Sequence, residues 1–107
     1  MELIKIIEKD NIQLASARHL YEFLEIKSEF PLWMKRVFEY GFEENVDYSV
    51  HFDDFKNEDA YKMTPQQRSA KGISLDYVIT LDMAKEISMI QKSEKGKQAR
   101  QYFIECE

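Results

Sequence analysis

The sequence predicts an α+β fold made of an N-terminal helix pair, a small antiparallel β-hairpin with a long loop, and a C-terminal helix pair. Two observations predict it. Apolar residues recur at helical spacing in four segments, and residues 47–52 and 73–79 instead alternate with a period of two. A chain of 107 residues is long enough for one hydrophobic core. We therefore expect residues 1–107 to form a single domain, either complete or the N-terminal domain of a longer protein.

The first forty residues predict a strand followed by two helices. Residues 1–7 favour a short strand or arm, and Lys9, Asp10 and Asn11 have the chemistry of a turn. Ser16 and Ser28 are the expected N-caps of the two helices, and Gly41 fits the end of the second. The apolar stripes of the helices are Ala17, Leu20, Tyr21 and Leu24, then Phe30, Trp33, Met34, Val37 and Phe38.

The middle of the chain predicts a hairpin in a two- or three-stranded sheet. Residues 47–52 and 73–79 are expected to pair across a polar loop over residues 53–72, which contains Pro65 and shows no sustained period. A loop of this length is usually functional or mobile.

The last third predicts a strand that runs into two helices. Leu75, Tyr77 and Ile79 alternate with Ser74, Asp76 and Val78, a period of two that only Val78 breaks. Thr80 is the expected N-cap of a helix over residues 81–90 that is apolar on most sides and therefore buried. A final helical stripe needs a partner surface and consists of Ala99, Tyr102, Phe103 and Cys106.

Four segments resemble the AntA/AntB family of phage antirepressor domains. They are LDMAKE at residues 81–86, EKGKQARQYFIECE at 94–107, SARHLYEFLEIKSEFPLWMKR at 16–36 and YGFEENVDY at 40–48, in the same order as in the family. The resemblance covers residues 14–107. It implies a protein of a temperate phage or prophage that opposes the lysogenic repressor, with a repressor protein as its partner and with no catalytic residues.

Charge and composition narrow the possible functions. The net charge is −5, and residues 41–60 alone contribute −6, from seven carboxylates and one lysine. Such a chain is a poor general DNA binder, because DNA affinity grows with the number of phosphates neutralised. It has one cysteine, no apolar run long enough to span a membrane and no signal peptide. We expect it in the cytoplasm of the bacterial host, without contact to membranes.

No pattern in the sequence indicates an enzyme. His19 and His51 stand apart without metal-ligand spacing, and the three glycines form no phosphate-binding loop. The adjacent carboxylates are more typical of a solvated acidic surface than of an acid/base pair. We therefore expect no enzymatic activity, no cofactor and no metal.

Two basic clusters are candidate contacts for a partner or for DNA. Residues 16–36 can form a helix-turn-helix whose Lys27, Ser28, Lys35 and Arg36 lie near phosphates or base edges. Tyr21 and Glu25 depart from that motif, which has a small residue and a glycine at their positions. A plain αα-hairpin and a protein contact stay open as alternatives. The second cluster is Lys92, Lys95, Lys97 and Arg100, around Gly96 in an expected turn. It suits a solubilising turn, an acidic partner or a nucleic-acid backbone.

The acidic segment is a candidate protein-contact face. It comprises Glu43, Glu44, Asp53, Asp54, Glu58 and Asp59, with Asp47 among them. Such a face would steer the protein toward the basic, DNA-reading surface of a repressor, although a solvated loop has the same composition.

Three functions follow from these patterns. The leading hypothesis is an antirepressor that binds a repressor protein. The alternative is a DNA-binding transcriptional regulator that uses residues 16–36. A third is an oligomerisation module in which the stripe from Ala99 to Cys106 pairs with a second copy across a two-fold axis.

Overall fold

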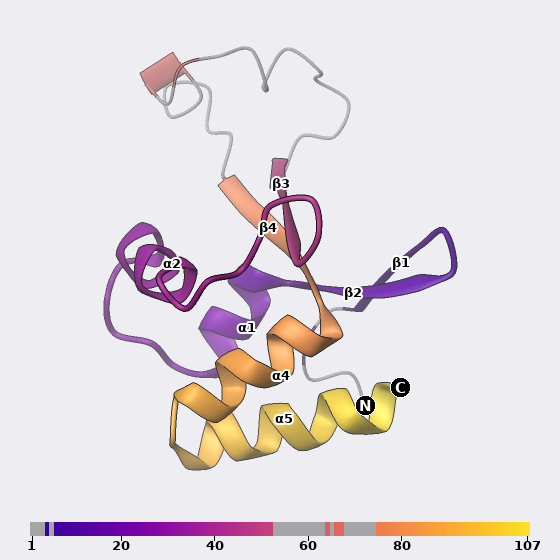
Figure 1. Ribbon diagram of the computed structural model, residues 1–107. Helices are drawn as coiled ribbons and strands as arrows, with labels where there is room; N and C mark the ends of the chain where they lie inside the picture. Colours follow the sequence, from indigo (N-terminus) through magenta and orange to yellow (C-terminus); the bar gives the residue numbers. More distant parts are fainter. Residues whose placement is uncertain (1–3, 5, 53–63, 65, 68–74) are drawn as a thin grey trace.

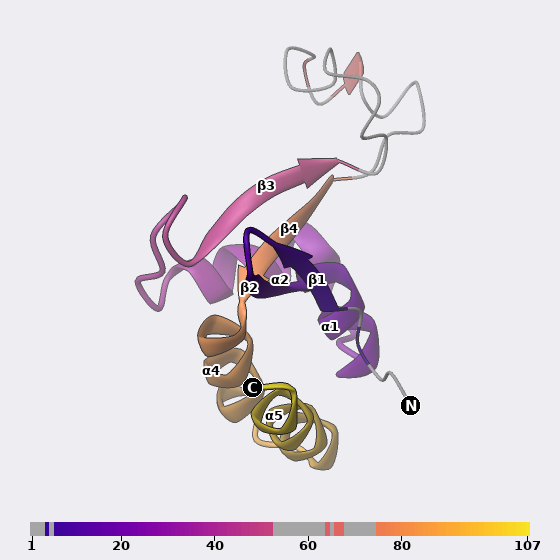
Figure 2. The same cartoon turned by 90° about the vertical axis from the view of Figure 1, so that its right-hand side faces the viewer.

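The computed structural model describes residues 4, 6–52, 64, 66–67 and 75–107. It confirms the predicted α+β class with its two helix pairs and its hairpin. The elements in chain order are β1 (Ile6–Lys9), β2 (Ile12–Ser16), α1 (Ala17–Phe23), α2 (Phe30–Phe38), β3 (Tyr48–Phe52), β4 (Leu75–Thr80), α4 (Leu81–Ile90) and α5 (Glu94–Cys106). Helices α4 and α5 lie side by side below the strands in both views (Figures 1 and 2).

The sheet is antiparallel with the strand order β1-β2-β4-β3. The predicted hairpin is confirmed, because β3 pairs with β4 from Tyr48 opposite Ile79 to Phe52 opposite Leu75. Most of the expected loop over residues 53–72 lies outside the described residues. Within it, the Thr64 amide donates to Gln67 Oε1 and the Gln67 amide donates to Thr64 Oγ1, which is the reciprocal pattern of a capping box.

The N-terminal hairpin corrects the prediction of a two- or three-stranded sheet. The first strand begins at Ile6 and continues to Lys9, and residues 1–3 and 5 lie outside the described residues. Asp10 and Asn11 have φ values of 52° and 64°, as a two-residue type I′ hairpin turn requires, so the predicted turn is confirmed. The chain then enters β2, a strand that the sequence did not predict and that makes the sheet four-stranded.

Helix α1 begins as predicted, whereas α2 begins one residue later than predicted. Ser16 Oγ accepts a hydrogen bond from the His19 amide at 3.2 Å. The N-cap of α2 is Glu29 and not Ser28, and it makes no side-chain cap. A cap at Ser28 would place Pro31 at the third helical position, where proline has no N–H to donate. After α2, Gly41 has the positive φ of 98° expected at a helix end, two residues beyond the C-cap.

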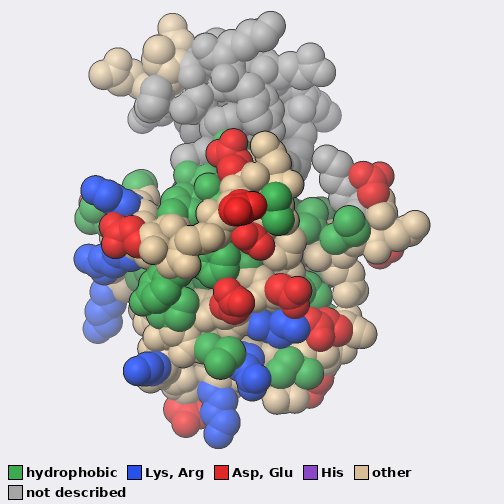
Figure 3. Space-filling model, in the orientation of Figure 1, with side chains coloured by type: hydrophobic (Ala, Val, Ile, Leu, Met, Phe, Trp, Pro, Cys, Tyr) green, Lys and Arg blue, Asp and Glu red, His purple; other side chains and the backbone are tan. Residues whose placement is uncertain are grey.

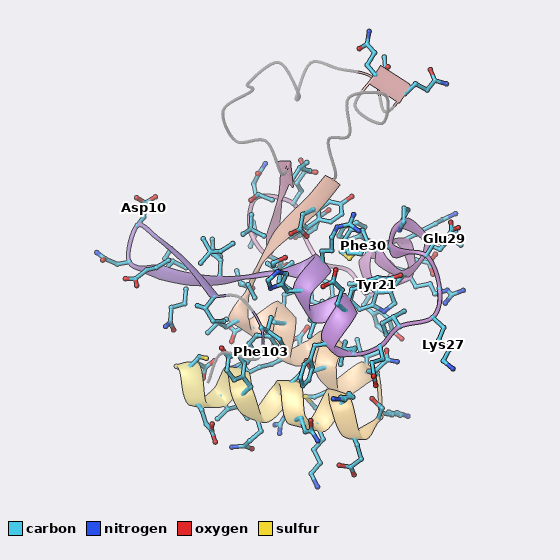
Figure 4. The ribbon with its side chains drawn as sticks, turned by 180° about the vertical axis from the view of Figure 1, so that it is seen from behind. Asp10, Tyr21, Lys27, Glu29, Phe30 and Phe103 are labelled. Atoms are coloured by element: carbon cyan, nitrogen blue, oxygen red, sulfur yellow. The ribbon has the colours of Figure 1, made fainter. Side chains whose placement is uncertain are left out.

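The C-terminal helices pack on the core of the same chain. Thr80 caps α4 as predicted, with Oγ1 accepting from the Met83 amide at 3.2 Å. Figure 4 shows Phe103 directed from α5 into the body of the domain, where it is fully buried. Ala99 is also fully buried, and the Tyr102 hydroxyl donates to the Ile4 carbonyl at 3.1 Å. The partner surface of the final stripe is therefore this chain's own core, and self-pairing through that stripe is wrong.

Two further expectations about the C-terminal helices need correction. Helix α4 is not buried throughout, because Met89 is 56% exposed at its end. Helix α5 begins at Glu94, so Gly96 lies in its first turn and not in a turn between two helices. None of the described helices has the length and apolar character needed to cross a membrane.

Candidate functional site

A continuous cluster of aromatic rings joins α2 to the sheet. Helix α2 buries Phe30, Trp33, Met34 and Val37 against the domain. The Phe30 ring lies 6.2 Å from Tyr77 of β4 between centroids, and the Phe38 ring lies 5.2 Å from Tyr77, edge to face. Each such pair stabilises the arrangement beyond its buried area. The rings therefore form a preorganised surface.

These rings form the floor of a groove beside α2. The groove has a volume of about 510 Å³ and is called the aromatic groove below. It is lined by Arg18, Phe30, Pro31, Met34, Lys35, Phe38, Glu39 and Tyr77. The Arg18 guanidinium lies 4.1 Å from the centre of the Phe30 ring, and Lys35 and Glu39 are exposed. An apolar centre with a charged rim is the usual composition of a protein-binding surface.

Tyr77 of the aromatic groove and its neighbour Tyr48 both have raised pKa values. Burial raises the pKa of Tyr77 above its ordinary value, and the neighbouring Tyr48 and Glu44 raise it further. The pKa of Tyr48 is also raised, by burial first and then by Glu44 and Asp47. Tyr77 therefore presents an uncharged phenol to the groove near neutral pH.

A second groove joins parts of the two basic clusters. It has a volume of about 530 Å³ and is lined by Leu24, Glu25, Ile26, Lys27, Ser28, Trp33, Arg36, Gln91, Ser93, Glu94 and Lys95. Arg36 donates to Ser28 Oγ at 3.2 Å, and the Lys95 ammonium lies 5.0 Å from the centre of the Phe23 ring. The carboxylates of Glu25 and Glu94 line the same groove and offset its positive charge.

Comparison with known protein families then decides the class of the chain. The AntA/AntB antirepressor family matches residues 15–93. The chain belongs to this family. The match confirms the resemblance over residues 15–93 and places the protein in a regulatory family, whereas the segment at residues 94–107 lies outside the matched range. Comparisons with curated proteins and with solved structures gave no match.

The predicted basic contacts of this antirepressor domain do not form one patch. Lys27, Ser28, Arg36 and Lys95 share the second groove, whereas Lys35 lines the aromatic groove. Lys92, Lys97 and Arg100 line a third groove, of about 400 Å³, at the junction of α4 and α5. In Figure 3 most of the blue side chains lie toward the left and lower edges, over α2 and the α4–α5 junction, and others lie nearer the centre of the face beside red side chains.

The described part of the predicted acidic face lies just before β3. Glu43 and Glu44 are exposed there. Asp47 has a structural role, because its Oδ2 accepts from the Glu43 amide at 2.8 Å and closes the turn. The other predicted members, Asp53, Asp54, Glu58 and Asp59, lie outside the described residues.

The predicted helix-turn-helix is present as a helix pair with an unusual connection. Residues 24–29 link α1 to α2, which is longer than the three- to four-residue turn of the motif. Glu25 stands where the motif has glycine, and its φ of 56° is the conformation that glycine adopts most easily. The Tyr21 hydroxyl donates to the Ser28 carbonyl at 2.6 Å, so it ties α1 to this connection. Figure 4 shows Lys27 projecting from this connection away from the domain.

Asp76, to which no role was assigned from the sequence, is buried. Its carboxylate accepts from Ser16 Oγ at 2.6 Å and from the Arg18 amide at 2.9 Å, so β4 holds the start of α1. The alternation along the strand shows which side chains share a face of the sheet. It does not show that α1 covers the face that carries Asp76. Among the described residues, no group of three or more His, Cys, Asp or Glu is arranged to hold a metal ion.

Proposed function

We propose that this antirepressor domain relieves repression of phage lytic genes by binding a repressor protein directly. The family match supports the antirepressor part of the proposal. The observation that best supports direct protein binding is the set of side chains exposed at the start of α2. The exposed residues there are Glu29, Pro31 and Leu32, and Leu32 is 53% exposed.

This chemistry suits a protein partner better than a DNA base pair. In a helix-turn-helix, the N-terminal residues of the second helix contact base edges, mostly through Arg, Lys, Asn or Gln. Pro31 and Leu32 have no side-chain donor, and the Glu29 carboxylate would lie near phosphates. The cations of α2, Lys35 and Arg36, lie in its last turn and line different grooves. An exposed apolar helix start beside an aromatic groove is instead typical of a protein interface.

The acidic surface before β3 adds an electrostatic component to the proposal. Glu43 and Glu44 are exposed, and the net charge of the chain is −5. A repressor that reads DNA presents a basic surface, so complementary charge would speed its encounter with this domain.

The test uses the purified domain and the purified repressor of the phage or prophage that encodes the domain. We expect a direct complex by isothermal calorimetry in nuclease-treated samples, with moderate weakening as salt rises. We also expect the domain to release the repressor from its operator in an electrophoretic mobility assay. Retention only in the presence of DNA, with affinity falling by orders of magnitude between low and moderate salt, would establish the DNA-binding alternative.

A further inference from the structure

We infer that the aromatic groove receives an amphipathic helix of the repressor, with the apolar side of that helix on the rings and its charged side chains on the rim. The inference rests on the proposed function and adds the place and the shape of the contact.

The lining of the groove favours a protein segment over a small molecule. Phe30, Pro31, Met34, Phe38 and Tyr77 are apolar or aromatic and form most of the wall. A small-molecule site normally adds a few polar groups that converge on the ligand to fix its orientation. The exposed charges here, on Lys35 and Glu39, lie at the rim, and the half-buried Arg18 guanidinium lies over the Phe30 ring. The volume of about 510 Å³ accommodates several apolar side chains from one partner segment.

The position of the groove in the fold favours a helix over a strand. An extended peptide binds by adding to a free sheet edge, where it pairs with backbone groups. The groove meets the sheet at Tyr77 on β4, which pairs with Val50 of β3 on one side. On the other side the pairing with β2 ends at Val78, and there the start of α1 lies against β4, with the Arg18 amide donating to Asp76. A helix needs no such pairing, because its backbone hydrogen bonds are internal.

The charges on the rim match the period of a helix. Lys35 and Glu39 are exposed and four residues apart, so they lie one turn apart along α2. A partner helix lying along α2 repeats at the same pitch of about 5.4 Å. It can therefore place a carboxylate near Lys35 and a cation near Glu39, one turn apart. The nine residues of α2 span about 13 Å, which corresponds to two to three turns of contact.

Reversal of this charge pair tests the contact. The double variant K35E/E39K keeps the net charge and the fold-determining residues but inverts the rim. We expect its affinity for the purified repressor to fall at least tenfold in calorimetry. The control is D82K/K85E, which reverses an ion pair on α4, outside the groove; Asp82 is 87% exposed, and Lys85 is 22% exposed and also pairs with Glu107. We expect the control to bind like the unmodified domain, with both variants folded by circular dichroism and thermal melting.

The outcomes separate this inference from the proposed function. If the unmodified domain binds the repressor and K35E/E39K binds equally well, the groove is not the contact and the proposed function stands. Weakening by the control as large as that by K35E/E39K would also overturn the groove assignment. If the unmodified domain binds no repressor at all, the proposed function itself fails.

A second measurement tests whether the repressor segment in the aromatic groove is a helix. Hydrogen exchange of the repressor, with and without the domain, should show protection confined to one helical segment with apolar residues every three or four positions. This segment, prepared as a peptide, should compete with the whole repressor for the domain. Protection of an extended or proline-rich segment instead would overturn the assignment of a helix.

Discussion

Gly96 lies at a point where α5 approaches α4 too closely for a side chain to fit. A Cβ atom at this position would lie 2.5 Å from the Ser88 carbonyl oxygen of α4 and 3.3 Å from Gln91 Cβ. The nearer obstacle is backbone, so α4 and α5 would have to move apart. Alanine normally stabilises a helix relative to glycine, but here the clash dominates. We expect Gly96→Ala to lower the free energy of unfolding by about 1–3 kcal/mol, measured by urea denaturation.

The control for Gly96 is Gln98→Ala, an exposed position on the same helix. This change should alter stability by no more than about 0.5 kcal/mol. Stability of Gly96→Ala equal to that of the control would contradict the close approach of the two helices. The sequence did not reveal the role of Gly96, because the role depends on how α5 packs against α4. In contrast, the sequence marked Glu25 as a departure from the helix-turn-helix motif, which has glycine at this position, and Glu25 has a φ of 56°.

Helix α1 is held at its start by a carboxylate from another element. Asp76 of β4 accepts from the Arg18 amide and from Ser16 Oγ, and Ser16 Oγ in turn accepts from the His19 amide. Hydrogen bonds to a charged group contribute about 1.5–3 kcal/mol. We expect Asp76→Ala to lower the free energy of unfolding by about 2–3 kcal/mol in urea. The amides of Arg18 and His19 should also exchange faster with solvent.

The control for Asp76→Ala is Asp82→Ala, which removes a carboxylate whose side chain is 87% exposed. Its effect should stay within about 1 kcal/mol, the usual limit for an exposed ion pair. Equal effects of the two substitutions would show that Asp76 does not anchor α1.

The elements differed in how well the sequence predicted them. Helix α2 and strands β3 and β4 have sustained apolar periods, so their existence and pairing were predictable. Strand β2 ends in Ala15 and Ser16, whose small side chains have little preference for strands. It forms because β1 and β4 pair with it on both sides and because its end is buried. Tertiary packing, and not local preference, decides this element.

At the scale of the whole molecule, the sequence predicted the class of the protein but not its surfaces. The candidate basic contact residues could be identified in the sequence, but the fold distributes them over three grooves. Phe30, Met34 and Phe38 were predicted as part of an apolar helix stripe, and periodicity does not show that a groove borders that stripe. The aromatic groove also needs Arg18 and Tyr77, which only the folded chain brings to α2.

The response of the whole domain to alkaline pH follows from two half-buried phenols and one lysine. The pKa values of Tyr77 and Tyr48 are raised in the folded state, mainly by burial, above the value of about 10 in an unfolded chain. The unfolded chain therefore loses these protons first as pH rises. The pKa of Lys85 is also raised, chiefly by its hydrogen bond to Glu107, and acts in the same direction. We expect the urea midpoint to be independent of these groups below about pH 9 and to fall progressively above about pH 10. Tyr77→Phe removes one of the phenols and should make the alkaline fall shallower. An equally steep fall in that variant would show that Tyr77 titrates alike in the folded and unfolded chain.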